Sequence, residues 1–92
     1  MKSINPYSGD IVFEAETHGQ AAIEAALTRA KGAVQKLKAM GLTARLDALR
    51  QAADLLDDER DAIAELMTRE MGKPIKPART EVEKCAWVCR YY

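Results

Sequence analysis

Apolar residues recur at intervals of three and four along most of the chain, from about residue 19 to the end. This spacing places them on one face of an α-helix and predicts about four amphipathic helices in succession. The second helix is expected after Gly41, the third ends at Gly72, and the fourth starts near Ile75. The first, over about residues 19–39, carries its stripe at Ile23, Ala26, Leu27, Ala30, Val34 and Leu37.

The inner face of this helical array is expected to consist of apolar side chains at the helical spacing. Their removal from water would supply the main stabilisation of the fold. The predicted inner-face residues are Ile23, Leu27, Leu46, Leu49, Leu56, Ile63, Leu66, Met67, Val82, Cys85 and Cys89.

Helix-capping residues mark the expected boundaries of the helices. Thr17 and Gln20 have the spacing of a capping box, in which the Thr17 hydroxyl accepts the Gln20 N–H and the Gln20 side chain reaches back. Thr43 is a suitable N-cap for the second helix. Gly72 can adopt the left-handed conformation that ends a helix.

Residues 1–17 are expected to form an extended arm or hairpin in front of the helices. Residues 5–6 (Asn-Pro) and 8–10 (Ser-Gly-Asp) are typical of turns, and the apolar run that follows them favours a strand. The predicted fold class is therefore mostly α, with residues 1–92 forming one helical segment. Its helices occupy residues 18–92.

The charge balance excludes some classes of partner. The chain has 14 Lys and Arg residues and 14 Asp and Glu residues, so its formal net charge is zero. Proteins that bind nucleic acid usually carry a basic excess or stripe, and no nucleic-acid partner is expected. No apolar run has the length of a membrane span, and the first residues lack the apolar core of a signal peptide. We therefore expect no membrane association and a cytoplasmic location.

Motifs for catalysis and cofactor binding are absent from the sequence. It contains no glycine-rich dinucleotide or phosphate loop, no HExxH and no CxxC. Because His18 is the only histidine, neither a Ser/His/Asp set nor a Cys/His set can be placed in the sequence. We predict no catalytic residue and no cofactor-binding residue in this chain.

Cys85 and Cys89 are the only cysteines and lie four residues apart, on one helical face. Two such ligands could supply half of a metal site, and metal or redox chemistry is one hypothesis. The favoured interpretation is two small apolar side chains on the inner face. Trp87, Tyr91 and Tyr92 lie off or at the edge of the stripe, which indicates a second contact face.

An acidic cluster lies where the second and third helices are expected to meet. Its members are Asp57, Asp58, Glu59 and Asp61. The cluster could hold a cation, but a solvated helix junction is favoured because exposure is the usual state of Asp and Glu.

Several stretches together resemble the NAD(P)-dependent aldehyde dehydrogenases. "INPYSGDIV" is similar to the N-terminal NPxTGE turn of that family, and "RLDALRQAADLLDDERDAIAELMTREMGKPI" is similar to its paired helices. "ARTEVEKCAWVCRYY" resembles the AxxEVxxxAxxxRYYA segment that follows. The matches occur in the family's order across nearly the whole chain. The residues of these motifs are most similar to those of the succinate-semialdehyde dehydrogenase branch.

The resemblance implies a much longer enzyme with a Rossmann-like cofactor domain, a catalytic domain and an oligomerisation flap. In this chemistry a cysteine attacks the aldehyde, hydride passes to NAD or NADP, and a glutamate-activated water releases the acid. The family's motifs for these steps follow the region that this chain resembles, and Cys85 and Cys89 match helix positions instead of the nucleophile. The 92 residues alone are therefore expected to be inactive and to bind no cofactor.

One minor site is also implied by the resemblance. Some family members hold a monovalent cation with backbone oxygens just before the NP turn and an acidic side chain from the EV helix. The matching positions are Ser3, Ile4 and Glu81. Oxygen ligands suit a hard cation, although an ordinary surface role for Glu81 is the favoured alternative.

Two kinds of partner follow from these hypotheses. An N-terminal portion of an aldehyde dehydrogenase would bind the rest of its parent enzyme, and the lack of a helix stop after Tyr92 favours this. The alternative is a stand-alone helical scaffold or protein-binding module derived from the family. It is favoured by Val34 and Leu37, which replace large aromatic residues common in the family. Exposed apolar helix faces would then favour self-association.

Overall fold

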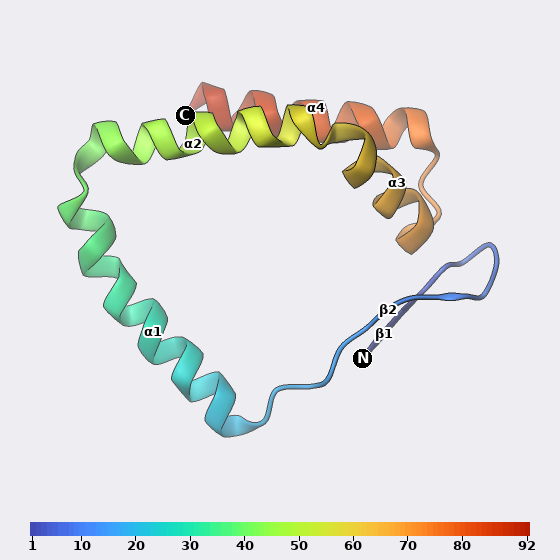
Figure 1. Cartoon of the computed structure of the whole chain (residues 1–92), viewed down its shortest axis with the longest axis horizontal. Helices are drawn as coiled ribbons and strands as arrows, with labels where there is room; N and C mark the ends of the chain where they lie inside the picture. Colours follow the sequence, from blue (N-terminus) through green and yellow to red (C-terminus); the bar gives the residue numbers. More distant parts are fainter.

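The computed structural model describes residues 1–92 as a two-stranded hairpin followed by four helices (Figure 1). No helix is both long enough and apolar enough to cross a lipid bilayer. The order of elements confirms the predicted mostly helical fold with a short N-terminal arm. The elements are β1 (Lys2–Ile4), β2 (Ile11–Glu14), α1 (Gln20–Ala39), α2 (Gly41–Asp58), α3 (Arg60–Met71) and α4 (Ile75–Tyr91).

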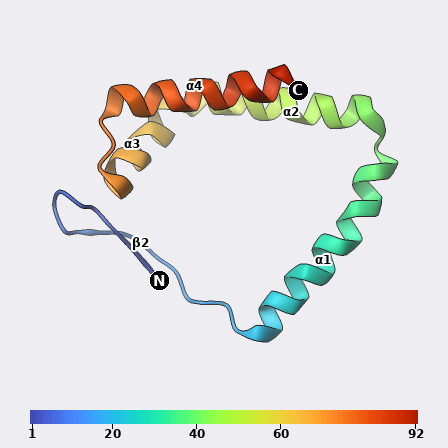
Figure 2. The same ribbon diagram turned by 180° about the vertical axis from the view of Figure 1, so that it is seen from behind.

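Helices α2, α3 and α4 pack together and contain every buried residue of the chain. Helix α4 runs antiparallel beside α2, and α3 packs on α4 at a steep angle to both (Figures 1 and 2). Small side chains at a helix contact allow the two axes to approach closely. The packing therefore depends on close backbone approach more than on large apolar side chains. The buried residues are Ala53, Ala64, Ala78, Val82 and Ala86.

Helix α1 lies apart from this three-helix unit. It meets α2 at a sharp bend at Gly41, which has a φ of 77°, and none of its residues is buried. The radius of gyration is 17.1 Å, whereas a compact chain of this length has about 12 Å. The molecule is thus a thin, open frame of 47 × 37 × 15 Å.

The N-terminal arm is an antiparallel hairpin whose turn is organised by Asn5. The Asn5 Oδ1 accepts the backbone N–H of Tyr7 at 2.9 Å, and the Asn5 N–H donates to the carbonyl of Asp10 at 2.8 Å. At the open end of the hairpin, the amino group of Met1 donates to the carbonyl of Ala15 at 2.7 Å. These bonds confirm the turn chemistry and the extended arm predicted for this segment.

Gly72 ends α3 in the left-handed conformation that the sequence predicts, with a φ of 73°. Its N–H donates to the carbonyl of Thr68 at 3.0 Å. The hairpin turn packs against this position, because a Cβ built on Gly72 would lie 3.0 Å from Cγ of Pro6. Both the positive φ and the close approach favour glycine here. The predicted start of α4 at Ile75 is also confirmed.

Two predicted helix caps are wrong. Helix α1 has no side-chain cap, and the Gln20 Nε2 donates to Glu24 Oε1 at 2.9 Å instead of returning to Thr17. Helix α2 begins at Gly41, so Thr43 lies inside its first turn and caps nothing. The cause in α2 is the short connection after α1, which leaves no extended residue to act as N-cap.

The predicted inner face is correct only in part. Val82 is buried, and the half-buried members are Leu46, Leu56, Ile63, Met67 and Cys89. The prediction is wrong for Ile23, Leu27, Leu49, Leu66 and Cys85, which are exposed. In α1 the reason is that no other element covers the stripe. In α2, α3 and α4, four of the five buried residues are alanines, and the larger predicted side chains other than Val82 are half-buried or exposed.

Candidate functional site

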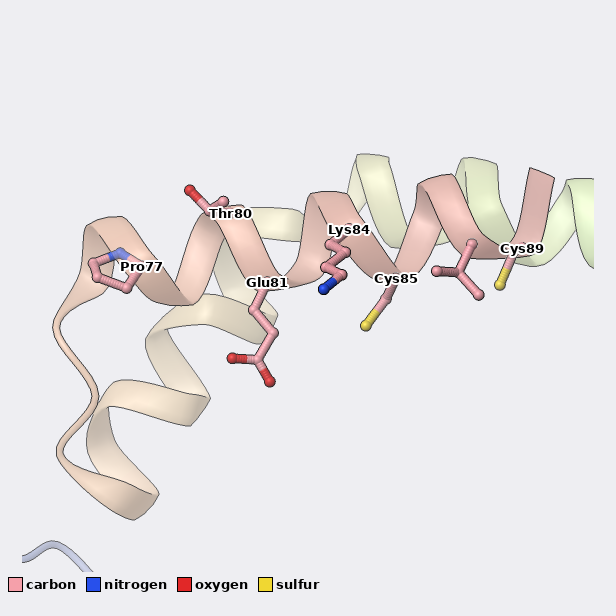
Figure 3. A pocket seen from close by; sticks show the side chains of 7 residues that line it. Pro77, Thr80, Glu81, Lys84, Cys85 and Cys89 are labelled. Atoms are coloured by element: carbon pink, nitrogen blue, oxygen red, sulfur yellow. The ribbon is translucent and has the colours of Figure 1, made fainter. Parts of the chain in front are cut away.

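A surface groove runs along the outer side of α4 (Figure 3). Four of its residues, at positions 77, 81, 85 and 89, recur at intervals of four and so form one stripe on the helix. The stripe is offset by one residue from Ala78, Val82 and Ala86, which pack on the other helices. The labelled residues of the groove are Pro77, Thr80, Glu81, Lys84, Cys85 and Cys89.

Both cysteines of the groove are free thiols, and they differ in exposure. Cys85 is exposed, so its interpretation as a buried apolar side chain is wrong, whereas Cys89 is half-buried. Val82 and Ala86 occupy the face of α4 that packs on the other helices. Cys85 therefore lies to one side of this contact. No group of three or more His, Cys, Asp or Glu side chains gathers to form a metal site. The cysteine pair therefore lacks further side-chain ligands of these types.

Glu81, the acidic residue of the predicted cation site, forms an ion pair with Lys73 in the α3–α4 connection. The other two predicted ligands, Ser3 and Ile4, lie in β1, where Ser3 is half-buried and pairs with Phe13 of β2. The ammonium of Lys73 supplies a positive charge at Glu81, so a monovalent cation would compete with it. The cation site at Ser3, Ile4 and Glu81 stays a prediction.

Asp61, in the first turn of α3, is the centre of a charged network with α4. Its Oδ1 accepts Nε of Arg60 at 3.1 Å and Nε of Arg79 at 2.9 Å, and Arg60 Nη1 also donates to Glu83 Oε1 at 3.1 Å. The hydrogen bond from Arg60, together with the charges of both arginines, holds the pKa of Asp61 below its ordinary value of 3.8. The same bond raises the pKa of Arg60. The network ties the start of α3 to α4.

Arg90, near the end of α4, binds two carboxylates of α2. Its Nη2 lies 2.7 Å from Asp54 Oδ1, and its Nη1 lies 2.7 Å from Asp57 Oδ2. These hydrogen bonds, that of Asp54 above all, raise the pKa of Arg90. The acidic cluster at the α2–α3 junction is exposed to solvent, as expected. Two of its members, Asp57 and Asp61, also form ion pairs with arginines. The sequence carries no signal for this pairing, because Asp54 and Arg90 are 36 residues apart.

Exposed aromatic side chains cover the end of α4. The ring centroids of Trp87 and Tyr91 are 5.6 Å apart, and those of Tyr91 and Tyr92 are 5.1 Å apart in an edge-to-face arrangement. All three side chains are mostly exposed. They lie outside the core, and the second contact face expected at these residues stays a prediction.

A second groove lies at the bend between α1 and α2, and its lining is mainly apolar. It contains Leu37 and Met40 from the α1 side and Leu42, Leu46 and Leu49 from α2. Neither this groove nor the one on α4 combines a nucleophile with a general base and an anion-binding donor set.

Comparison with known proteins identifies relatives over the whole chain. The model of the "Aldehyde dehydrogenase family" matches residues 1–92. The chain is 43% identical over 92 residues to a probable succinate-semialdehyde dehydrogenase (NADP(+)) of Synechocystis sp.. It is 36% identical over 93 residues to the succinate-semialdehyde dehydrogenase (NADP(+)) of Mycobacterium avium.

A third relative is the succinate semialdehyde dehydrogenase (NAD(P)+) of Escherichia coli, with 36% identity over 98% of this chain. The chain spans 20% of the length of each of these three relatives. The comparisons confirm the resemblance drawn from the NP turn, the paired helices and the RYY segment, and they match an N-terminal segment of the family.

Proposed function

Because the chain belongs to the aldehyde dehydrogenase family, we propose that it is the N-terminal portion of an NAD(P)-dependent succinate-semialdehyde dehydrogenase. The observation that carries this proposal is the 43% identity across all 92 residues to a relative of which the chain spans 20%. The complete enzyme would oxidise succinate semialdehyde to the acid and pass the hydride to NAD or NADP.

The 92 residues would contribute a scaffold to such an enzyme. No histidine lies on the helices, both cysteines lie on α4 without a paired base, and no glycine-rich loop precedes a helix in the manner of a dinucleotide site. We therefore expect neither aldehyde oxidation nor NAD(P) binding by these residues alone. The nucleophile, the general base and the cofactor site would come from the rest of the enzyme.

The rest of the parent dehydrogenase is the partner that this proposal requires. Support comes from the apolar stripe of α1, which includes Leu27 and Val34 and has no buried residue. The aromatic group at the end of α4 supports it as well, because exposed Trp and Tyr are enriched where proteins meet. Both surfaces would become buried in a larger enzyme.

A chimera with a known relative tests the proposal. The corresponding segment of the Synechocystis relative is replaced by this chain, and NADPH formation from succinate semialdehyde is followed by absorbance. We expect the chimera to assemble like its host and to produce NADPH. The matched control carries Val82→Asp in the inserted segment, which buries an unpaired charge and is expected to abolish assembly. A chimera that assembles but forms no NADPH contradicts the proposal.

The alternative function is a stand-alone helical scaffold or binding module derived from the same family. The observation that favours it is the contact among α2, α3 and α4, which is formed entirely within this chain. Thermal unfolding of the 92-residue chain followed by circular dichroism separates the two. A cooperative transition together with an inactive chimera would support the module, whereas an active chimera would support the dehydrogenase.

A further inference from the structure

Helix α1 carries an apolar seam with the spacing of a coiled coil. Ile23, Leu27, Ala30, Val34 and Leu37 follow one another at intervals of four, three, four and three residues. This alternation keeps the side chains on the side that faces a neighbouring helix. The four larger ones are 44%, 65%, 46% and 51% exposed in order along the helix. The seam thus has the pattern of a surface that packs on a second helix, and no other helix of the chain covers it.

The accessible surface of the chain leaves room for a stable interface. It amounts to 7498 Å², whereas a compact monomer of the same mass exposes about 5,300 Å². The excess of about 2,200 Å² is larger than the roughly 800 Å² that each partner buries in a standard interface. A dimer of this chain would therefore need only part of the surplus.

The seam continues into the groove at the bend between α1 and α2. Leu37 belongs to both the seam and the groove, and Leu42, Leu46 and Leu49 extend the apolar lining along α2. A helix that lies along α1 in the opposite direction would place its N-terminal end at this groove. Ile23 is the seam residue at that end of α1.

We propose that α1 pairs in antiparallel fashion with α1 of a second copy of this chain. Leu27 of one copy then faces Leu37 of the other, and the end that carries Ile23 enters the groove at the bend. The arrangement has two-fold symmetry, so every contact occurs twice. This inference concerns the free 92-residue chain and does not depend on the activity of a longer enzyme, in which the rest of that enzyme would cover the same seam.

The charges beside the seam determine the direction of pairing. Glu24, Lys31 and Lys38 flank it at intervals of seven residues, and Glu24 is the one acidic residue of α1. In the antiparallel pair Glu24 of each copy meets Lys38 of the other, and the two copies of Lys31 meet near the axis. Two attractive contacts thus oppose one repulsive contact. A parallel pair places no acidic side chain opposite a lysine.

Sedimentation equilibrium of the purified chain over a concentration series tests the pairing. We expect the mass to reach twice the chain mass of 10.2 kDa. Leu27→Glu should return the protein to the monomer and weaken association at least about a hundredfold, because each dimer would bury two unpaired carboxylates. Leu27 has no buried contact within the chain, so circular dichroism should show unchanged helix content.

Leu66→Glu is the matched control. Leu66 is also a helical leucine and is 50% exposed, but it lies on α3. The dimer is expected to persist in this variant. The direction of pairing is tested by Glu24→Lys, which should weaken the dimer roughly fivefold, and by adding Lys38→Glu to the same chain, which should restore it.

Three results would overturn the proposal. A wild-type chain that stays monomeric throughout the series excludes the dimer. Equal loss of association in Leu66→Glu and Leu27→Glu places the interface elsewhere. Failure of Lys38→Glu to restore the Glu24→Lys variant excludes the antiparallel arrangement. Activity of the chimera is measured separately, so each proposal can fail without the other.

Discussion

Gly72 at the end of α3 lies against Pro6 in the turn of the N-terminal hairpin. A Cβ on Gly72 would come within 3.0 Å of Cγ of Pro6, and Gly72 also has a φ of 73°. The glycine thus ends a helix and at the same time provides the space in which the hairpin meets the three-helix unit. The hairpin turn and the end of α3 are far apart in the sequence, and their contact depends on the absence of a side chain at Gly72.

Gly72→Ala is expected to destabilise the fold by about 1–2 kcal/mol, because alanine is strained at positive φ and its methyl group would press on the proline ring. Urea unfolding followed by circular dichroism measures the change. Gly32→Ala is the control: Gly32 is within α1 and has nothing near its Cβ position. It should stabilise its helix by up to about 1 kcal/mol. Equal effects of the two substitutions would disprove the role of Gly72.

Ala86→Leu should disrupt the packing of α4 on its neighbours. Ala86 is fully buried, and the extra carbon atoms would push the helices apart at a cost of about 1–3 kcal/mol. Ala25→Leu adds the same atoms to the exposed surface of α1 and should change stability by less than about 0.5 kcal/mol. The free energies of unfolding of the two variants, measured in urea, are compared with that of the wild-type chain. Tolerance of leucine at position 86 would show that the helices do not pack closely there.

Asp61 should make the stability of the chain depend on pH in the acid range. Its pKa in the folded chain is lower than the ordinary 3.8, mainly because of the hydrogen bond from Arg60. The carboxylate therefore stabilises the folded state fully above its unfolded pKa, and the contribution is lost as pH falls through the lower folded pKa. Asp61→Asn should remove this part of the acid sensitivity.

Urea midpoints measured at neutral pH and in steps below about pH 4 test this expectation. Asp58→Asn is the comparison, since no ion pair is formed by Asp58 in the structure while its side chain lies at the same helix junction. If both substitutions change the urea midpoints below about pH 4 by the same amount, the ion pairs of Asp61 with the arginines make no specific contribution to stability.

Cys85 should react with iodoacetamide faster than Cys89. Both are free thiols on one stripe of α4, but only Cys85 is exposed, and alkylation requires access of the reagent to sulfur. Peptide mass spectrometry after short reaction times gives both rates in one sample. The rates should become more similar in urea. Equal rates in the folded chain would mean that α4 is rotated from its position in the structure.

The helices themselves were largely predictable from the chain. The spacing of three and four among apolar residues indicates where each helix runs, and Gly72 with Pro74 marks the end of α3 because few residues adopt a positive φ. The turn at Asn5 was equally readable, since its side chain forms hydrogen bonds within a few residues. The family resemblance was also contained in the sequence, because its motifs are contiguous stretches.

The partners of each helix face were decided by the tertiary structure. A stripe such as that of α1 has the same pattern whether it is buried or exposed, so Leu27 was expected inside the fold but is exposed in the single chain. Burial of Ala53 and Ala86 follows from how closely α2 and α4 approach, and the pairing of Arg90 with Asp54 follows from their antiparallel packing. The sequence determined local conformation because it arises from neighbouring residues. Only the folded chain determined the contacts, because these join residues that the sequence keeps far apart.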